Sequence, residues 1–148
     1  SHFLLNLGAS DGRCTGGALY DPANCLLLGR NYSGLVFEGQ EEHFVPLARR
    51  FGGRPDVHLR LAWSTPSSVV AAAEAVAAPR SPDLIKIDVD NCDACFLEAL
   101  LDRFDPKLIH VEIEAELPPG LVRRHPFLAA PGAFGRGVGA PGSLGAFL

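Results

Sequence analysis

The sequence has no excess of basic residues. Its 148 residues include 13 Lys and Arg against 17 Asp and Glu, a formal net charge of −4. Proteins that bind nucleic acids need a basic surface that pairs with phosphates. No apolar run reaches the roughly 18 residues of a membrane span, and the first residues lack the pattern of a signal peptide. We therefore expect no nucleic-acid partner, no membrane contact and a cytoplasmic location.

The composition predicts one globular domain. Hydrophobic residues make up 47% of the chain and charged residues 20%, which is enough apolar surface for a single core. The chain begins with Ser1 rather than Met and ends without a stop signal for its last element. We therefore expect a fragment of a longer protein, with the domain in residues 1–128. Gly, Pro and Ala dominate residues 129–148, which predicts a loop or tail.

Cysteine is scarce, and its spacing argues against a zinc site. Cys92 and Cys95 form a CxxC, but Cys14 and Cys25 do not make a second pair of that kind, and a structural zinc needs four ligands. A redox CxxC at a helix start needs a stabilised thiolate, which the adjacent Asp93 opposes. We therefore expect plain thiols, with zinc binding or redox chemistry as the alternatives.

Apolar residues alternate between strand-like and helix-like spacing along the chain. Five strands are predicted at residues 3–7, 33–39, 57–63, 83–90 and 107–113. Helices are predicted at residues 41–51, 66–78 and 93–104, while residues 15–24 remain ambiguous. This alternation predicts an α/β fold, a three-layer Rossmann-like sandwich with a mostly parallel sheet of about five strands. In such a sheet a ligand lies beyond the carboxyl ends of the strands.

Two loops at that edge could hold a nucleoside. Gly8 and Gly12 follow the first strand, where glycine allows either a tight turn or close approach of the backbone to a ligand, and a helix N-terminus could follow Asp11 and Gly12. Glu38 ends the second strand and could accept hydrogen bonds from ribose hydroxyls, or be a solvated acid that caps the next helix. Because Ser10 stands where a GxGxxG fingerprint needs glycine, a nucleoside without a pyrophosphate is favoured over NAD or FAD.

An acidic cluster follows the fourth strand. Asp88, Asp90 and Asp93 could bind a metal, hold a ligand amine or supply a base, or Asp90 and Asp93 could cap the next helix. We expect Asp90 to face away from Asp88, so we assign no metal. On the fifth strand Glu112 and Glu114 face the same side, and one of them could reach the site or both could be solvated.

Trp63, just after the third strand, has two possible roles. It could stack on an adenine, or it could pack in the core, which is the commoner role of an aromatic side chain.

Four segments in this order resemble a known family: NLGASDG, GLVFEGQEEHFVPL, DLIKIDVDNCDACFLEALL and KLIHVEIEAELPP. They resemble S-adenosylmethionine-dependent methyltransferases of the seven-stranded class I fold, in particular the FkbM-like branch. The resemblance covers about residues 3–120. The order of the motifs is more specific than any one of them.

The resemblance implies transfer of a methyl group from S-adenosylmethionine to an oxygen of a small-molecule or sugar acceptor. The loop after the first strand would line the methionine and ribose, Glu38 would bind the ribose hydroxyls, and Trp63 and Ser64 would lie near the adenine. Asp88 would lie beside the sulfonium and the acceptor, as a base or a positioning group. The cofactor-binding residues implied are Asn6, Gly8, Ala9, Ser10, Gly12, Glu38, Gly39, Trp63, Ser64 and Asp88.

The chain departs from the family pattern in three places. Asn6 stands where the family usually has an acid, and Asn91 and Cys92 stand where many relatives have a glycine. The chain also stops before the hairpin of strands six and seven that ends the family's sheet. Two other functions are therefore open. One is a catalytically degenerate methyltransferase fold with a binding or interaction role, and the other is a metal-using nucleotide-sugar enzyme with Asp88 and Asp90 as a DxD pair.

Overall fold

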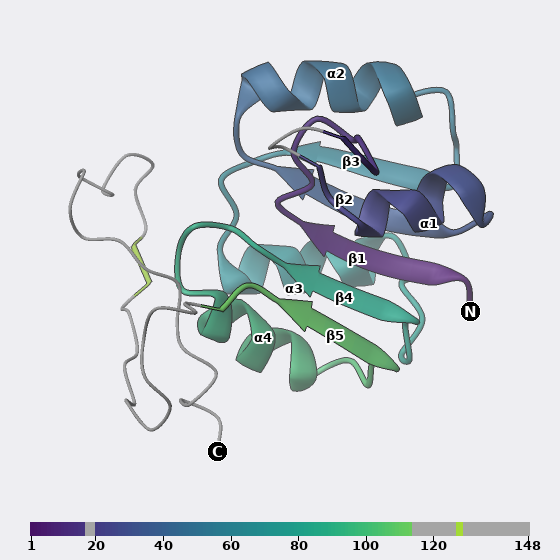
Figure 1. The fold of residues 1–148 in the computed structure, drawn as a ribbon. Coiled ribbons are helices and arrows are strands. Elements are labelled where there is room, and N and C mark those ends of the chain that lie inside the picture. The colour runs from purple at the N-terminus through teal and green to yellow at the C-terminus, as the bar shows by residue number, and fades with distance from the viewer. Residues whose placement is uncertain (17–19, 114–126, 129–148) are drawn as a thin grey trace.

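The computed structural model describes residues 1–16, 20–113 and 127–128 (Figure 1). Within them, five strands form one parallel sheet in the order β3-β2-β1-β4-β5. The strands are β1 (Phe3–Leu7), β2 (Ser33–Glu38), β3 (Val57–Leu61), β4 (Leu84–Ile87) and β5 (Leu108–Val111). The predicted α/β fold with a parallel sheet is confirmed. The tail expected at residues 129–148 lies outside the described residues.

Helices cover both faces of this sheet (Figure 1). Side chains of alternating strand positions pack with α1 and α2 in one core cluster and with α3 and α4 in the other, as the period of two in a strand requires. The helices are α1 (Ala23–Gly29), α2 (Glu41–Phe51), α3 (Pro66–Ala75) and α4 (Asp93–Leu101). The fold is therefore a three-layer, Rossmann-like sandwich.

Local sequence signals explain where the predicted helices begin. Helix α2 starts with Glu41 and Glu42 and ends with Arg49 and Arg50, charges that complement the helix dipole at each end. Helix α3 starts at a capping box in which Thr65 accepts from the Ser68 backbone N–H at 3.1 Å. These two helices follow the predicted pattern closely.

The first helix begins later than the sequence suggested. The carboxylate of Asp21 accepts a hydrogen bond from the Ala23 backbone N–H at 2.8 Å and so starts α1 there. The possibility that a helix begins directly after Asp11 and Gly12 is therefore not realised, and of the ambiguous residues 15–24 only Ala23 and Asn24 lie in a described helix. The reason is that Asp11 pairs with Arg13 in a local turn instead of opening a helix.

The expectation of plain thiols is also wrong. Cys14 is bonded to Cys25 and Cys92 to Cys95, with Cα atoms 4.7 and 5.2 Å apart. The loop after β1 returns alongside α1, which brings together two cysteines that are separated in sequence. Disulfides persist mainly in oxidising compartments and are rare in the cytosol, so the pairing does not support the cytoplasmic expectation. None of the described helices is long and apolar enough to cross a membrane.

The ends of β1 and β4 meet at Gly8. Its φ is +78°, and a Cβ at this position would lie 1.8 Å from the carbonyl oxygen of Asp88. The N–H groups of Gly8 and Ala9 both donate to the Phe37 carbonyl of β2 at 3.0 Å. Glycine is therefore required here to bring the ends of three strands together.

We predict that Gly8→Ala destabilises the fold far more than Gly16→Ala. Both glycines have a positive φ, but a Cβ at Gly16 meets no atom of the described residues within 4 Å. Gly16→Ala should therefore cost only the left-handed strain, about 1–2 kcal/mol, while Gly8→Ala adds a clash with backbone. The free energies of unfolding in urea compare the two. If both substitutions lowered the free energy of unfolding equally, the close approach of β1 and β4 at Gly8 would be contradicted.

Candidate functional site

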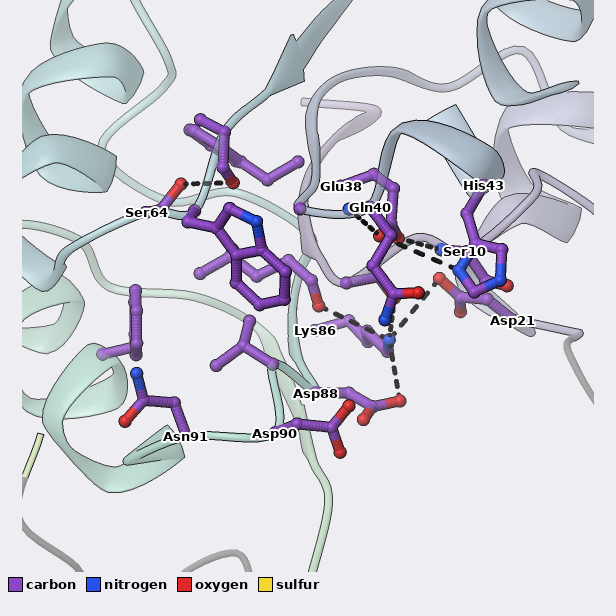
Figure 2. Close-up of a pocket in the computed structure, with 18 of the residues that line it drawn as sticks. Ser10, Asp21, Glu38, Gln40, His43, Ser64, Lys86, Asp88, Asp90 and Asn91 are labelled. Carbon is purple, nitrogen blue, oxygen red and sulfur yellow. Dashed lines mark hydrogen bonds and ion pairs between the residues drawn. The ribbon is translucent and has the colours of Figure 1, made fainter. Parts of the chain in front are cut away.

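A cavity of about 290 Å³ opens at the carboxyl ends of β1, β2, β3 and β4 (Figure 2). The chain runs outward from β1 to β3 on one side of the sheet and then crosses to β4 and β5 on the other. The cavity thus lies at the switch point of the sheet, where α/β folds bind their ligands. Its volume is near the lower end of the roughly 300–1,000 Å³ found for small-molecule sites.

The structure brings most of the sequence-predicted site residues to this cavity. Its lining includes Gly8, Ser10, Glu38, Gly39, Trp63, Ser64 and Asp88. The other three do not line it, and each has a structural role. Asn6 and Ala9 are fully buried, and Gly12 packs against α2, where a Cβ would lie 3.0 Å from Leu47 Cδ1.

Glu38 is buried at the end of β2, with 6% of its surface exposed. One carboxylate oxygen accepts from the Ser10 N–H and the other from the Gln40 N–H, each at 2.8 Å. His43 Nδ1 lies 4.0 Å from the same carboxylate. Glu38 is therefore not a solvated acid, although its bond to Gln40 does stabilise the start of α2. It joins the loop after β1 to the end of β2.

Trp63 lies outside the core. It is 56% exposed and lines the cavity. A Cβ at Gly39 would lie 3.1 Å from two atoms of the Trp63 ring, so this glycine makes room for the indole. The chain's single tryptophan thus offers an exposed aromatic surface to a ligand.

Lys86 is the residue at the centre of the site that the sequence reading missed. It is 2% exposed, and its Nζ lies 2.6 Å from the Gly8 carbonyl oxygen, 3.1 Å from Asp88 Oδ2 and 3.7 Å from Asp21 Oδ2 (Figure 2). The available signal was a single charge within the apolar strand β4, two residues before Asp88 and so on the same face. A buried ammonium needs partners, and these are the acids that it contacts.

A buried polar network supports the cavity from behind. Asn6 Nδ2 donates to Asp21 Oδ2 at 2.6 Å and to Asn24 Oδ1 at 3.3 Å. Asn24 Nδ2 donates to the Ala9 carbonyl oxygen at 3.0 Å. Asp21 lines the cavity and is 3% exposed. It was also missed, because the sequence around it does not indicate that this loop comes back to the carboxyl end of β1. Asn6 therefore positions an acid and does not face the cavity itself.

Asn91 joins a distant part of the chain to the cavity mouth. Its side-chain amide donates to the Leu128 carbonyl oxygen and accepts from the Leu128 N–H, both at 3.1 Å. The ring of Phe127 packs edge-on against Phe96, with centroids 5.9 Å apart. Asn91 and Phe96 both line the cavity, so residues 127–128 lie behind that part of its wall.

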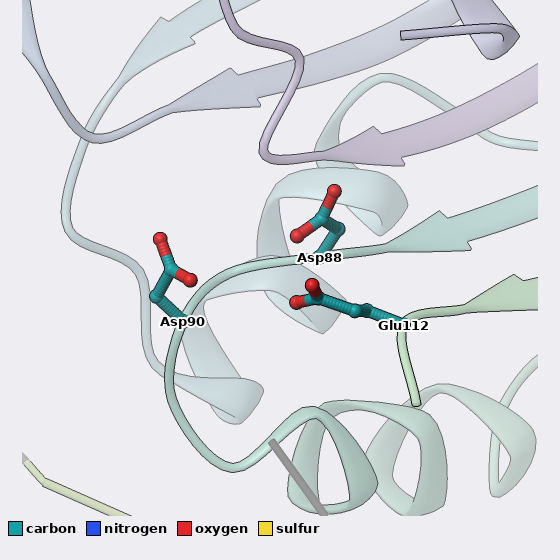
Figure 3. Close-up of side chains that lie close together, drawn as sticks. All are labelled: Asp88, Asp90 and Glu112. Atoms are coloured by element: carbon teal, nitrogen blue, oxygen red, sulfur yellow. The ribbon is translucent and has the colours of Figure 1, made fainter. Parts of the chain in front are cut away.

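Asp88, Asp90 and Glu112 converge beside the cavity (Figure 3), with one oxygen of each within 4.8 Å of the others. The expectation that Asp90 faces away is wrong. Residues two apart in a strand share a face, and here Asp88 and Asp90 follow the end of β4 at Ile87 in a turn where Asp90 has a φ of +51°. The register that pairs Ile87 with Val111 brings Glu112 opposite Asp88. Such oxygens suit a hard cation, but Asp90 and Glu112 are exposed, and we assign no metal to them. Glu114 lies outside the described residues.

Burial, together with the crowding of acids, raises two pKa values here. Partial burial, with the nearby charge of Asp88 and a hydrogen bond to it, raises the pKa of Glu112 to about 7. Burial raises the pKa of Asp93 to about 7 against the opposing hydrogen bond from the Val89 N–H, and the charges of Asp88 and Asp90 add to the shift. Asp93 lies at the start of α4 and holds the turn that carries Asp88 and Asp90.

The charge of the cavity lining is strongly negative. Among the described residues that line it there are four carboxylates, those of Asp21, Glu38, Asp88 and Asp90, and one ammonium, that of Lys86. That ammonium is already engaged by two of the carboxylates. The lining therefore disfavours phosphate groups and favours a ligand that carries positive charge.

Comparisons with known proteins give no relative. No family model matches the chain, and neither a curated protein nor a solved structure matches it.

We predict that Asp93 makes stability fall as pH rises. Its native pKa of about 7 exceeds the ordinary 3.8, so between these values the native state holds a proton that the unfolded chain has released. At about 1.4 kcal/mol per pKa unit, the loss from pH 4 to 8 is at most about 4 kcal/mol. Asp93→Asn should flatten the profile.

Urea unfolding between pH 4 and 8 tests this expectation. Asp102→Asn is the matched control, because Asp102 is an exposed acid at the other end of α4. Parallel profiles for the wild type and Asp93→Asn would contradict the account of a buried acid.

Proposed function

We propose that this chain is an S-adenosylmethionine-dependent methyltransferase domain that methylates an oxygen of a small-molecule or sugar acceptor. One observation carries the proposal: an acidic cavity at the switch point of the sheet, with the carboxylate of Glu38 at the end of β2. The resemblance of four sequence segments to FkbM-like methyltransferases supports the same function.

The residues present fit a nucleoside at this edge. Each Glu38 oxygen accepts one backbone N–H and keeps a further lone pair for a ribose hydroxyl. Ser10 Oγ is buried without a hydrogen-bond partner among the described residues, although Ser10 lines the cavity, so a polar ligand atom would satisfy it. Trp63 would stack on the adenine.

The charge of the cavity selects among nucleoside cofactors. S-adenosylmethionine carries a sulfonium and an ammonium against one carboxylate, a net positive charge. Dinucleotides carry a negative pyrophosphate, which Asp21, Asp88 and Asp90 would repel. The acidic lining therefore supports S-adenosylmethionine over NAD or FAD, in agreement with the absence of a GxGxxG loop.

In the proposed reaction the cofactor supplies a methyl group already activated by its sulfonium. The chain's own residues orient the acceptor and receive a proton. Asp88 lies where it can orient the acceptor hydroxyl. As the oxygen–carbon bond forms and the sulfur–carbon bond breaks, the hydroxyl proton would pass to Asp88, which lines the cavity. Glu112, which lies within 4.8 Å of Asp88 and has a pKa raised to about 7, would receive the proton from it.

We predict that the folded chain binds S-adenosylhomocysteine and that Glu38→Gln weakens this binding about tenfold or more. The amide retains only one of the two oxygen acceptors, so a ribose hydrogen bond is lost. Glu41→Gln is the matched control, because Glu41 is an exposed acid in the first turn of the adjacent helix. Calorimetric titration measures the affinities.

Thermal unfolding of each variant separates a lost ligand contact from a lost fold, since Glu38 also joins two loops. A folded wild-type chain that takes up neither S-adenosylhomocysteine nor S-adenosylmethionine would overturn the proposal. Equal affinity in Glu38→Gln and the wild type would remove Glu38 from the site.

A further inference from the structure

Lys86 has no part in the mechanism above, yet it is the most constrained charged group in the site. Its ammonium has three N–H donors, and four oxygens surround it: those of Gly8, Leu7, Asp88 and Asp21, at 2.6, 3.4, 3.1 and 3.7 Å. All its protons are engaged. Lys86 is therefore not poised as a nucleophile and instead ties the end of β1, the loop before α1 and the end of β4 together.

Asp88 is the member of the cluster of Asp88, Asp90 and Glu112 that Lys86 contacts. Asp90 and Glu112 each have an oxygen within 4.8 Å of it. Glu112 shares a hydrogen bond with Asp88, whereas the charge of Asp90 repels that of Asp88. The Asp88 side chain is 44% exposed, so packing alone does not fix it. Among the described residues, the Lys86 ammonium, 3.1 Å away, is the one positive charge paired with the Asp88 carboxylate.

We propose that Lys86 is a positioning residue that holds the Asp88 carboxylate toward the cavity, so that Asp88 acts as a fixed negative charge opposite the cationic centre of the ligand. This inference rests on the proposed function. It assigns to Asp88 the recognition of charge, and to Lys86 an effect that is exerted through Asp88.

The inference predicts how the chain distinguishes two ligands of nearly the same shape. S-adenosylmethionine carries the sulfonium charge, and S-adenosylhomocysteine lacks it. The wild type should prefer the charged ligand, and Lys86→Met should reduce that preference about tenfold, since a nearby fixed charge contributes at least this much at the edge of a protein. If only the net charge of the cavity mattered, Lys86→Met would increase the preference for S-adenosylmethionine, because removing an ammonium makes the cavity more negative.

The test measures the affinity of each ligand by calorimetry and by the fluorescence of the single tryptophan, Trp63. Lys86→Arg is the second variant: it keeps the charge but not the contact geometry of the ammonium, and it too should reduce the preference. Asp88→Asn should give the same loss, and adding Lys86→Met to it should reduce the preference no further. Lys107→Met is the control. Lys107 precedes β5 and pairs with Asp83, which precedes β4, so this ion pair lies at the amino ends of the strands, away from the cavity.

Several outcomes would overturn the inference. An increased preference for S-adenosylmethionine in Lys86→Met means that only net charge matters. An unchanged preference in Lys86→Arg and Lys86→Met, with both affinities lowered equally, means a purely structural role. These results leave the proposed function standing, whereas a folded wild type that binds neither ligand removes the proposed function itself.

Discussion

The close approach of β1 and β4 at Gly8 is the constraint on which the site depends. A Cβ there would lie 1.8 Å from the Asp88 carbonyl, so the two strand ends can meet only at a glycine. The same junction lets the Lys86 ammonium reach the Gly8 carbonyl oxygen at 2.6 Å. Because the chain changes direction across the sheet between these strands, the junction also forms the floor of the cavity.

The chemistry of the cavity follows from what surrounds this junction. Strand ends bring Glu38 and Asp88 to one edge, and the loop before α1 adds Asp21 behind them. Among the described lining residues, the ammonium of Lys86 is the one that opposes their charge, and it is held by Asp21 and Asp88. We infer that this lining suits a nucleoside with positive charge better than one with phosphate groups.

Much of this arrangement could be predicted from short-range signals. Short apolar runs predicted most of the strands, and their alternation with helical segments predicted the parallel sheet. Because such sheets bind ligands beyond the carboxyl ends of their strands, the positions of Gly8 and Glu38 at a ligand site could be predicted as well. Lys86 was missed, although Asp88 lies only two residues away, because its partners Gly8 and Asp21 are distant in sequence. Asp21 was missed for the same reason, since Lys86 and Asn6 are remote from it in the chain. The pairing of Cys14 with Cys25 could not be predicted either, because no local sequence pattern indicates that the loop after β1 comes back alongside α1. Asp90 was misjudged because the period of two in a strand puts Asp88 and Asp90 on one face rather than on opposite faces, and because the turn after Ile87 that brings them together was not expected.

The central claim is that this junction binds S-adenosylmethionine, and a titration followed by amide chemical shifts tests it most directly. The account predicts chemical-shift changes concentrated at Gly8 and Ser10 in the loop after β1, at Gln40 after β2 and at the indole N–H of Trp63. Shifts confined to the opposite edge of the sheet would contradict the claim, as would none in a well-dispersed spectrum.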